Sequence, residues 1–169
     1  PNTGIIDFAE VSRAYATEML EAGGELISGA RVTGISRNGG EVRLETTAGD
    51  LSVKHVINCA GLQVDQVARM MGVDVGVRII PFRGEYYSLK PERDHLVKGL
   101  LYPVPDPAMP FLGVHFTRRI SGSVEAGPNA VLALKREGYR KTSFDLGDAV
   151  GTLTYSGFWR LSFKYWKSG

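Results

Sequence analysis

Apolar positions near the start of the chain repeat with the spacing of an amphipathic helix. They are Phe8, Val11, Tyr15, Met19 and Leu20. Asp7 precedes this series and Glu10 follows three residues later, the arrangement of an acidic N-cap with a first-turn carboxylate. Gly23-Gly24 offers the left-handed backbone with which helices commonly end. The pattern predicts a helix that begins at Asp7 and ends before the two glycines.

The next part of the chain is rich in β-forming residues, with apolar and polar positions in alternation. It predicts strands at 25–27, 31–37, 41–47 and 51–53, with turns at 38–40 and 48–50. A short apolar run at 55–61 ends in Ala60-Gly61, and a helical pattern continues from 64 to 71. We interpret these segments as a buried strand that enters a helix through a tight turn.

The second half of the chain begins with a further series of strand-like segments. Strands are predicted at 77–81, 84–89, 100–104, 111–117 and 123–127. A turn at 119–122 joins the last two, which predicts an antiparallel sheet. Helical segments then follow at 130–137, 145–153 and 157–167. The whole pattern predicts an α+β fold with two domains, residues 1–75 and residues 76–169.

The composition is that of a globular protein rather than a disordered, fibrous or membrane-spanning one. Of the 169 residues, 43% are hydrophobic and 22% are charged, and no apolar run approaches the ~20 residues that cross a bilayer. The single cysteine, Cys59, excludes an internal disulfide and a cysteine-based zinc site, which favours a reducing compartment. The formal net charge of +2 is too small to indicate a nucleic-acid partner.

The two ends of the sequence are unusual. It opens with Pro1-Asn2-Thr3-Gly4, without an initiator methionine or the basic and apolar segments of a signal peptide. At the other end a helical pattern runs almost to the last residue. We therefore expect a piece of a larger, cytoplasmic protein.

The glycines exclude two common phosphate-binding motifs. None of the 21 glycines stands two positions from another, so the chain contains no GxGxxG sequence, and no P-loop is present either. The residues alone leave Ala60-Gly61 open to two interpretations, tight packing of a helix on a strand or close approach of the backbone to a ligand.

Five short sequence blocks, taken in order, resemble one family. They look like the middle part of the L-2-hydroxyglutarate dehydrogenase/oxidase family, a branch of the D-amino-acid oxidase-like FAD-dependent oxidoreductases. The resemblance covers essentially the whole chain. It implies that residues 1–75 are a partial FAD-binding domain and residues 76–169 an antiparallel substrate-binding domain with a helical end. The blocks are Asn58-Cys59-Ala60-Gly61-Leu62-Gln63, Pro81-Phe82-Arg83-Gly84-Glu85-Tyr86-Tyr87, Tyr102-Pro103-Val104-Pro105-Asp106-Pro107, Leu112-Gly113-Val114-His115-Phe116-Thr117-Arg118 and Glu125-Ala126-Gly127-Pro128-Asn129-Ala130.

The resemblance implies oxidation of L-2-hydroxyglutarate, or a similar 2-hydroxy acid, to the 2-oxo acid by FAD. Val32 resembles the residue whose backbone meets the adenine, and Ala60-Gly61 the turn that passes close to the pyrophosphate. The alternative for Val32 is an inward-facing strand residue. We expect the chain by itself not to retain FAD, because the phosphate-binding loop is missing.

The same resemblance places a substrate site in the second half. His115 is the candidate base that removes the hydroxyl proton, since imidazole titrates in the right range. Tyr102, with Arg83 or Arg118, is the candidate partner of the substrate carboxylates. Structural alternatives remain open for each: a structural histidine, an aromatic residue of the sheet, and a surface ion pair of Arg83 with Glu85 or Glu125.

Positive charge and aromatic residues gather at the end of the chain. From residue 131 onward seven basic residues stand against three acidic ones. Residues 157–167 suit either peripheral contact with an anionic membrane or packing against the rest of the protein. The electron acceptor is either oxygen or, at a membrane, a quinone. We also expect self-association of the isolated chain. Two alternatives to this function remain. The chain is a catalytically silent structural or interaction fragment, or it belongs to an oxidase of 2-amino acids.

Overall fold

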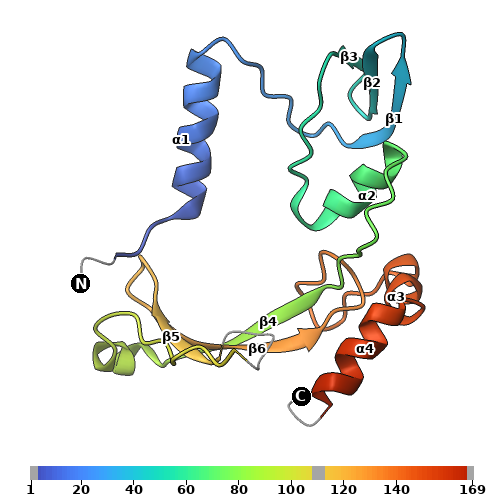
Figure 1. Ribbon diagram of the computed structural model, residues 1–169. Helices are drawn as coiled ribbons and strands as arrows, with labels where there is room; N and C mark the ends of the chain where they lie inside the picture. The colour runs from blue at the N-terminus through green and yellow to red at the C-terminus, as the bar shows by residue number, and fades with distance from the viewer. Residues whose placement is uncertain (1–3, 108–112, 167–169) are drawn as a thin grey trace. The chain divides into compact units, whose positions relative to one another are not determined.

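The computed structural model describes residues 4–107 and 113–166, and it has the α+β composition that the sequence predicts. The chain forms two compact units. The first contains residues 1–26 and 82–132, and the second contains residues 27–81 and 133–169. Each unit carries its own antiparallel three-stranded sheet (Figure 1). The domain boundary between residues 75 and 76 stays a prediction from the sequence.

The first unit begins with helix α1 (Phe8–Glu21), which confirms the predicted helix. Its N-cap is Asp7, whose Oδ1 accepts a hydrogen bond from the Ala9 N–H at 2.8 Å. In the first turn Glu10 pairs with Arg13 at 2.6 Å. The chain leaves the helix through Gly23, whose φ of 86° lies in the left-handed region.

The sheet of the first unit has the strand order β4-β6-β5, with β4 at Phe82–Ser88, β5 at His115–Arg118 and β6 at Val124–Leu132. Both pairings are antiparallel, as predicted. The turn between β5 and β6 is closed by a hydrogen bond from the Arg119 N–H to the Ser123 carbonyl at 2.8 Å. A 3-10 helix, η2 (Pro91–Leu96), follows β4.

Two predictions for the second half are wrong. Strand 100–104 is reduced to a single bridge between Leu101 and Phe116. The helix predicted at 130–137 is absent, because β6 continues to Leu132 and pairs along β4, with Val131 opposite Arg83. Pairing with a neighbouring strand overrides a local helical pattern here.

The sheet of the second unit is the predicted meander, β1 (Val32–Asn38), β2 (Glu41–Thr46) and β3 (Leu51–Val53), in that order. Val42 on the central strand is buried. Residues 25–27 form no strand, and neither do residues 77–81. A bulge lies between Val32 and Gly34, where β1 pairs with β2.

The buried strand predicted at 55–61 is also wrong. Residues 55–60 have no regular structure, and the side chain of Ile57 is 87% exposed. A strand needs a hydrogen-bonded neighbour, and no described strand pairs with this segment. The tight turn that follows is nevertheless present as the 3-10 helix η1 (Gly61–Gln63), which leads directly into the predicted helix, α2 (Val64–Met70).

The second unit ends with two helices, α3 (Leu146–Leu153) and α4 (Ser156–Tyr165), which confirm the last two predicted helices. Asp145 caps α3 by accepting a hydrogen bond from the Asp148 N–H at 2.9 Å. Phe158 of α4 is buried, whereas Phe163 and Trp166 are exposed. Within the described residues, none of the helices has the length and apolar character that crossing a membrane requires.

Candidate functional site

His115 opens strand β5 and is almost completely buried, with 7% of its surface exposed. Its Nδ1 lies 3.1 Å from the backbone carbonyl oxygen of Gly113. A carbonyl oxygen can only accept a hydrogen bond, so in the neutral imidazole this contact places the proton on Nδ1. The lone pair is then on Nε2. The arrangement leaves Nε2 as the atom of His115 that can take a proton.

Two tyrosine rings surround the imidazole. Tyr102 stacks on it, with ring centroids 4.3 Å apart and planes 18° apart. Tyr86 meets it edge to face, at 6.4 Å and 77°. The bridge between Leu101 and Phe116 holds the backbone beside Tyr102 against β5. Because Tyr102 is 51% exposed, the stacked pair connects a buried imidazole to the protein surface.

Two glycines make room for the Tyr86 ring. Gly127 lies opposite His115 in the sheet. A Cβ at Gly127 would come within 2.7 Å of the Tyr86 ring and 2.8 Å of the Glu85 carbonyl oxygen. A Cβ at Gly84 would lie 3.3 Å from the same ring. Residue 127 therefore needs the absence of a side chain for Tyr86 to reach His115, and residue 84 leaves little room for one.

Neither candidate arginine contacts His115, and Arg118 lies on the other face of this sheet. His115 and Tyr86 contact each other on one face. Since side chains alternate along a strand, Arg118, three residues after His115, points to the opposite face. Arg83 lies on β4 opposite Val131, on the other side of a register shift between Glu85 and Tyr87. The structure brings Tyr102 to His115 but does not bring either arginine to it.

Each arginine also has partners of its own. Arg83 donates a hydrogen bond to Glu85 at 2.7 Å, which is one of the two ion pairs considered from the sequence. Arg118 Nη1 donates to the carbonyl oxygen of Val97 at 3.0 Å and lies 3.4 Å from that of Asp94. The carboxylate of Asp94 in turn accepts from the Val124 N–H. Arg118 thus fixes η2 on the sheet, and contact of either arginine with substrate stays a prediction.

The turn predicted to face the FAD pyrophosphate is open on its outer side. Gly61 has φ of 52°, and a Cβ there would meet no atom within 4 Å. The turn is held locally by Asn58, whose Nδ2 donates to the Val64 carbonyl at 2.8 Å and whose Oδ1 accepts from the Ala60 N–H at 3.2 Å. A rigid, open turn of small residues fits close approach of a large ligand.

Val32 lies at the start of β1, an edge strand of the meander. The preceding residue, Arg31, turns its backbone toward β2: its carbonyl accepts from the Thr47 N–H at 3.0 Å, and its N–H donates to Thr47 Oγ1 at 2.9 Å. Successive residues direct these groups to opposite sides of a strand, so the N–H and C=O of Val32 point to the open edge. This direction fits hydrogen bonding to an adenine edge.

A cluster of buried charges that the sequence did not reveal lies beside α2. Asp65 is buried and accepts two hydrogen bonds from Arg136, at 2.6 and 2.8 Å. Arg69 reaches the same carboxylate at 3.1 Å. Burial by itself raises the pKa of Asp65, but the hydrogen bonds from the two arginines outweigh it and lower the pKa from 3.8 to about 2. Asp65 and Arg136 are 71 residues apart, so no local spacing in the sequence signals the pair.

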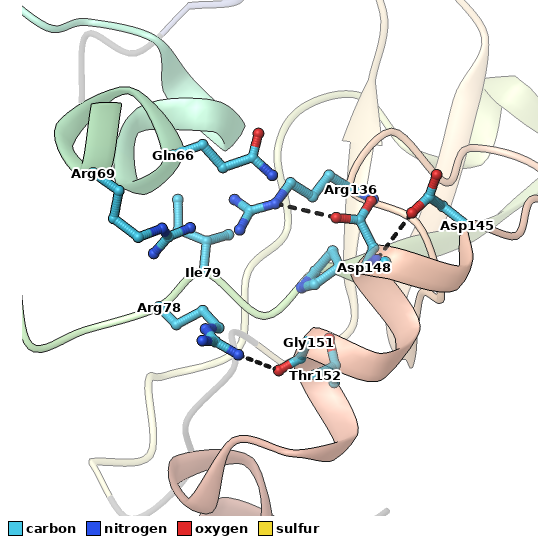
Figure 2. Close-up of a pocket in the computed structure, with 11 residues that line it drawn as sticks. Gln66, Arg69, Arg78, Ile79, Arg136, Asp145, Asp148, Gly151 and Thr152 are labelled. Atoms are coloured by element: carbon cyan, nitrogen blue, oxygen red, sulfur yellow. Dashed lines mark hydrogen bonds and ion pairs between the residues drawn. The ribbon is translucent and has the colours of Figure 1, made fainter. Parts of the chain in front are cut away.

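Arg136 and Arg69 also line a cavity of about 340 Å³ (Figure 2). Gln66 and Arg69 reach it from α2, and Asp148 from the first turn of α3. On another wall Arg78 donates to the Gly151 carbonyl at 2.5 Å. No group of three or more metal-ligating side chains occurs among residues 4–107 and 113–166.

Comparison with known proteins decides the family. The model of the family described as FAD dependent oxidoreductase matches residues 1–153. The chain belongs to this family. A curated relative named L-2-hydroxyglutarate dehydrogenase, from Indibacter alkaliphilus, is 49% identical over 170 residues, which cover all of this chain and 43% of the relative.

Other members of this FAD dependent oxidoreductase family are nearly as similar. A protein of the same name from Escherichia coli (strain K12) is 45% identical over 170 residues, and one named as mitochondrial from Mus musculus is 41% identical over 181 residues. All of the chain is covered in both alignments, together with 40% and 39% of the relatives. The chain spans about two fifths of the length of these relatives.

Proposed function

We propose that this chain is part of an enzyme that oxidises L-2-hydroxyglutarate, or a closely similar 2-hydroxy acid, to the 2-oxo acid. Membership of the FAD dependent oxidoreductase family and the names of relatives at 41–49% identity support this proposal. The observation that carries it is the geometry of His115, a buried imidazole with Nδ1 bound to the Gly113 carbonyl and Nε2 left to act as a base.

The reaction removes two hydrogens from the substrate. Bound FAD would supply the acceptor for the hydride that leaves C2. The hydroxyl proton goes to Nε2 of His115, and the C2–O bond becomes a carbonyl. The Gly113 carbonyl keeps the proton on Nδ1 and fixes the plane of the ring. Stacking by Tyr102 covers one face of the imidazole and holds the ring plane, in which the lone pair of Nε2 points to the hydroxyl.

Tyr102 has a second role in this proposal. Its ring is half exposed, so its hydroxyl can donate a hydrogen bond to a substrate carboxylate while the ring stays on His115. A role of Arg83 or Arg118 in binding the second carboxylate stays a prediction from the sequence. In Arg118 the Nη1 group donates to the Val97 carbonyl, so a carboxylate would have to be bound through the other N–H groups of the guanidinium.

Val32, Ala60 and Gly61 would hold the cofactor through backbone groups. The direction of the Val32 amide and carbonyl toward a sheet edge supports contact with adenine, and the open turn at Gly61 supports passage of the pyrophosphate. Both contacts lack charge, so we expect the chain by itself to purify without stoichiometric FAD. Oxygen or quinone as electron acceptor, peripheral membrane contact through 157–167, self-association and a cytoplasmic location stay predictions from the sequence.

The test is a substrate comparison with the product of the complete reading frame that encodes this chain. L-2-hydroxyglutarate should support turnover, whereas D-2-hydroxyglutarate and L-glutamate should not. L-glutamate has the same carbon skeleton with an amino group, so turnover of L-glutamate alone would favour the 2-amino-acid oxidase. Absence of turnover with every substrate, in a protein loaded with FAD, would refute the proposed activity.

A further inference from the structure

We propose that Arg136 is the positioning residue of the cofactor turn at Ala60-Gly61. The inference rests on the proposed function, which assigns this turn to FAD. Arg136 stands 75 residues after Gly61 in the sequence and outside all five blocks that carry the family resemblance. Its side chain nevertheless contacts the residue that follows the turn glycine.

The contact is a hydrogen bond to the backbone of η1. Arg136 Nη1 donates to the Leu62 carbonyl at 2.5 Å and to Asp65 Oδ1 at 2.6 Å. Nη2 donates to Asp65 Oδ2 at 2.8 Å. One guanidinium therefore ties the middle of the 3-10 turn to the first turn of α2. Because it is planar and its N–H groups have fixed directions, it sets the orientation of the turn as well as its position.

The other side of Arg136 is anchored to α3. Its Nε lies 3.5 Å from Asp148 Oδ1, and its backbone N–H donates to Asp148 Oδ2 at 2.9 Å. Figure 2 shows the side chain extended from this anchor toward α2. A second, weaker contact runs parallel to it, from Gln63 Nε2 to the Glu137 carboxylate at 3.5 Å. The segment 136–137 thus holds η1 from outside.

The environment makes the arginine hard to replace. Its side chain is 8% exposed and that of Asp65 is 3% exposed, so the two charges are shielded from water and from salt. A lysine would keep the charge but could not reach the Leu62 carbonyl and both carboxylate oxygens of Asp65 in the same plane. Arg136→Lys should therefore loosen the turn without leaving Asp65 wholly unpaired, since Arg69 still contacts it.

Arg69 provides the matched control. It binds the same carboxylate from the exposed side, at 3.1 Å, and this partner, Asp65, lies in α2 rather than in the turn. If Arg136 acts by neutralising Asp65, Arg69→Lys and Arg136→Lys should have similar consequences. If Arg136 acts by orienting η1, only Arg136→Lys should affect the turn.

The experiment uses the protein from the complete reading frame, with FAD removed and added back. Hydrogen exchange of the apoprotein reports on the turn itself: amides of residues 61–65 should exchange at least 10-fold faster in Arg136→Lys than in Arg69→Lys. The dissociation constant for FAD should rise roughly 10-fold or more in Arg136→Lys and little in Arg69→Lys, the scale of losing one hydrogen bond to a charged group. In a protein that already carries Gly61→Ala, Arg136→Lys should lower the affinity for FAD by a smaller factor, because the two substitutions act on the same turn.

Equal exchange in the two arginine variants would overturn the inference while leaving the proposed function intact. A different result would contradict the assignment of the turn to FAD: faster exchange in Arg136→Lys, with unchanged FAD affinity in both Arg136→Lys and Gly61→Ala. The turn would then not contact FAD, and the inference would fail because the proposed cofactor contact fails. Additive effects of Arg136→Lys and Gly61→Ala on FAD affinity would also contradict it. Should Arg136→Lys not fold, Asp148→Ala removes the anchor of Arg136 and should shift exchange and affinity in the same direction.

Discussion

The ring of Tyr102 lies parallel to the imidazole of His115, 4.3 Å away between centroids. Tyr102 comes from a segment without regular structure, and His115 from strand β5. The Leu101–Phe116 bridge brings these segments together. Combined with the bond from Nδ1 to the Gly113 carbonyl, the stack fixes the imidazole plane and leaves Nε2 for chemistry.

Removing the Tyr102 hydroxyl should weaken substrate binding while leaving proton transfer to His115 nearly unchanged. In the complete protein Tyr102→Phe keeps the ring on His115 and loses the hydrogen bond to a carboxylate. We expect KM for L-2-hydroxyglutarate to rise roughly 10-fold, with kcat changed by less than about threefold. Tyr102→Leu also removes the stack and should lower kcat in addition. An unchanged KM in Tyr102→Phe would show that the Tyr102 hydroxyl does not bind the substrate.

Gly127→Ala should destabilise the sheet of the first unit. The new methyl group would meet the Tyr86 ring at 2.7 Å and the Glu85 carbonyl oxygen at 2.8 Å, and the backbone contact cannot be relieved by a rotamer change. We expect a loss of about 1–3 kcal/mol in the free energy of unfolding, measured by urea denaturation. Gly99→Ala, which meets no atom within 4 Å, is the control. Equal stability of the two variants would contradict the packing described for Tyr86.

Asp65 should make stability depend on acid pH. The pKa of Asp65 is lowered from 3.8 to about 2 in the folded chain. Its contribution to the free energy of unfolding is therefore fully present above pH 3.8 and is lost as the pH falls through 2. The shift corresponds to about 2 kcal/mol. An NMR titration of the side-chain carboxyl carbon should give a midpoint near 2. A midpoint near 4 would show that Arg136 does not hold the carboxylate as described.

Local signals in the sequence predicted those elements that local interactions determine. Helix α1 has its N-cap at Asp7, helix α3 has its N-cap at Asp145, and the meander turns at glycines with positive φ such as Gly39. These features depend on residues within a few positions of one another. The resemblance to FAD-dependent oxidoreductases, which rested on ordered blocks, is confirmed by the family match.

The errors arise where distant segments decide the outcome. Residues 130–132 carry a helical pattern but extend β6, because β4 pairs with them from almost 50 positions away. The pairing of Asp65 with Arg136 likewise joins segments that no local pattern connects. The face of the sheet on which Arg118 lies relative to His115 likewise becomes known only once the strand register is fixed.

The most direct test of the account is the rate at which L-2-hydroxyglutarate reduces bound FAD in a single turnover. In the product of the complete reading frame, rapid mixing without an electron acceptor should bleach the flavin. His115→Gln should slow this step by ~10² to 10⁴-fold with FAD still bound, because the hydroxyl proton loses its acceptor. His95→Gln, which changes an exposed histidine of η2, should leave the rate unchanged. Flavin reduction as fast in His115→Gln as in the unmodified protein would contradict the central claim.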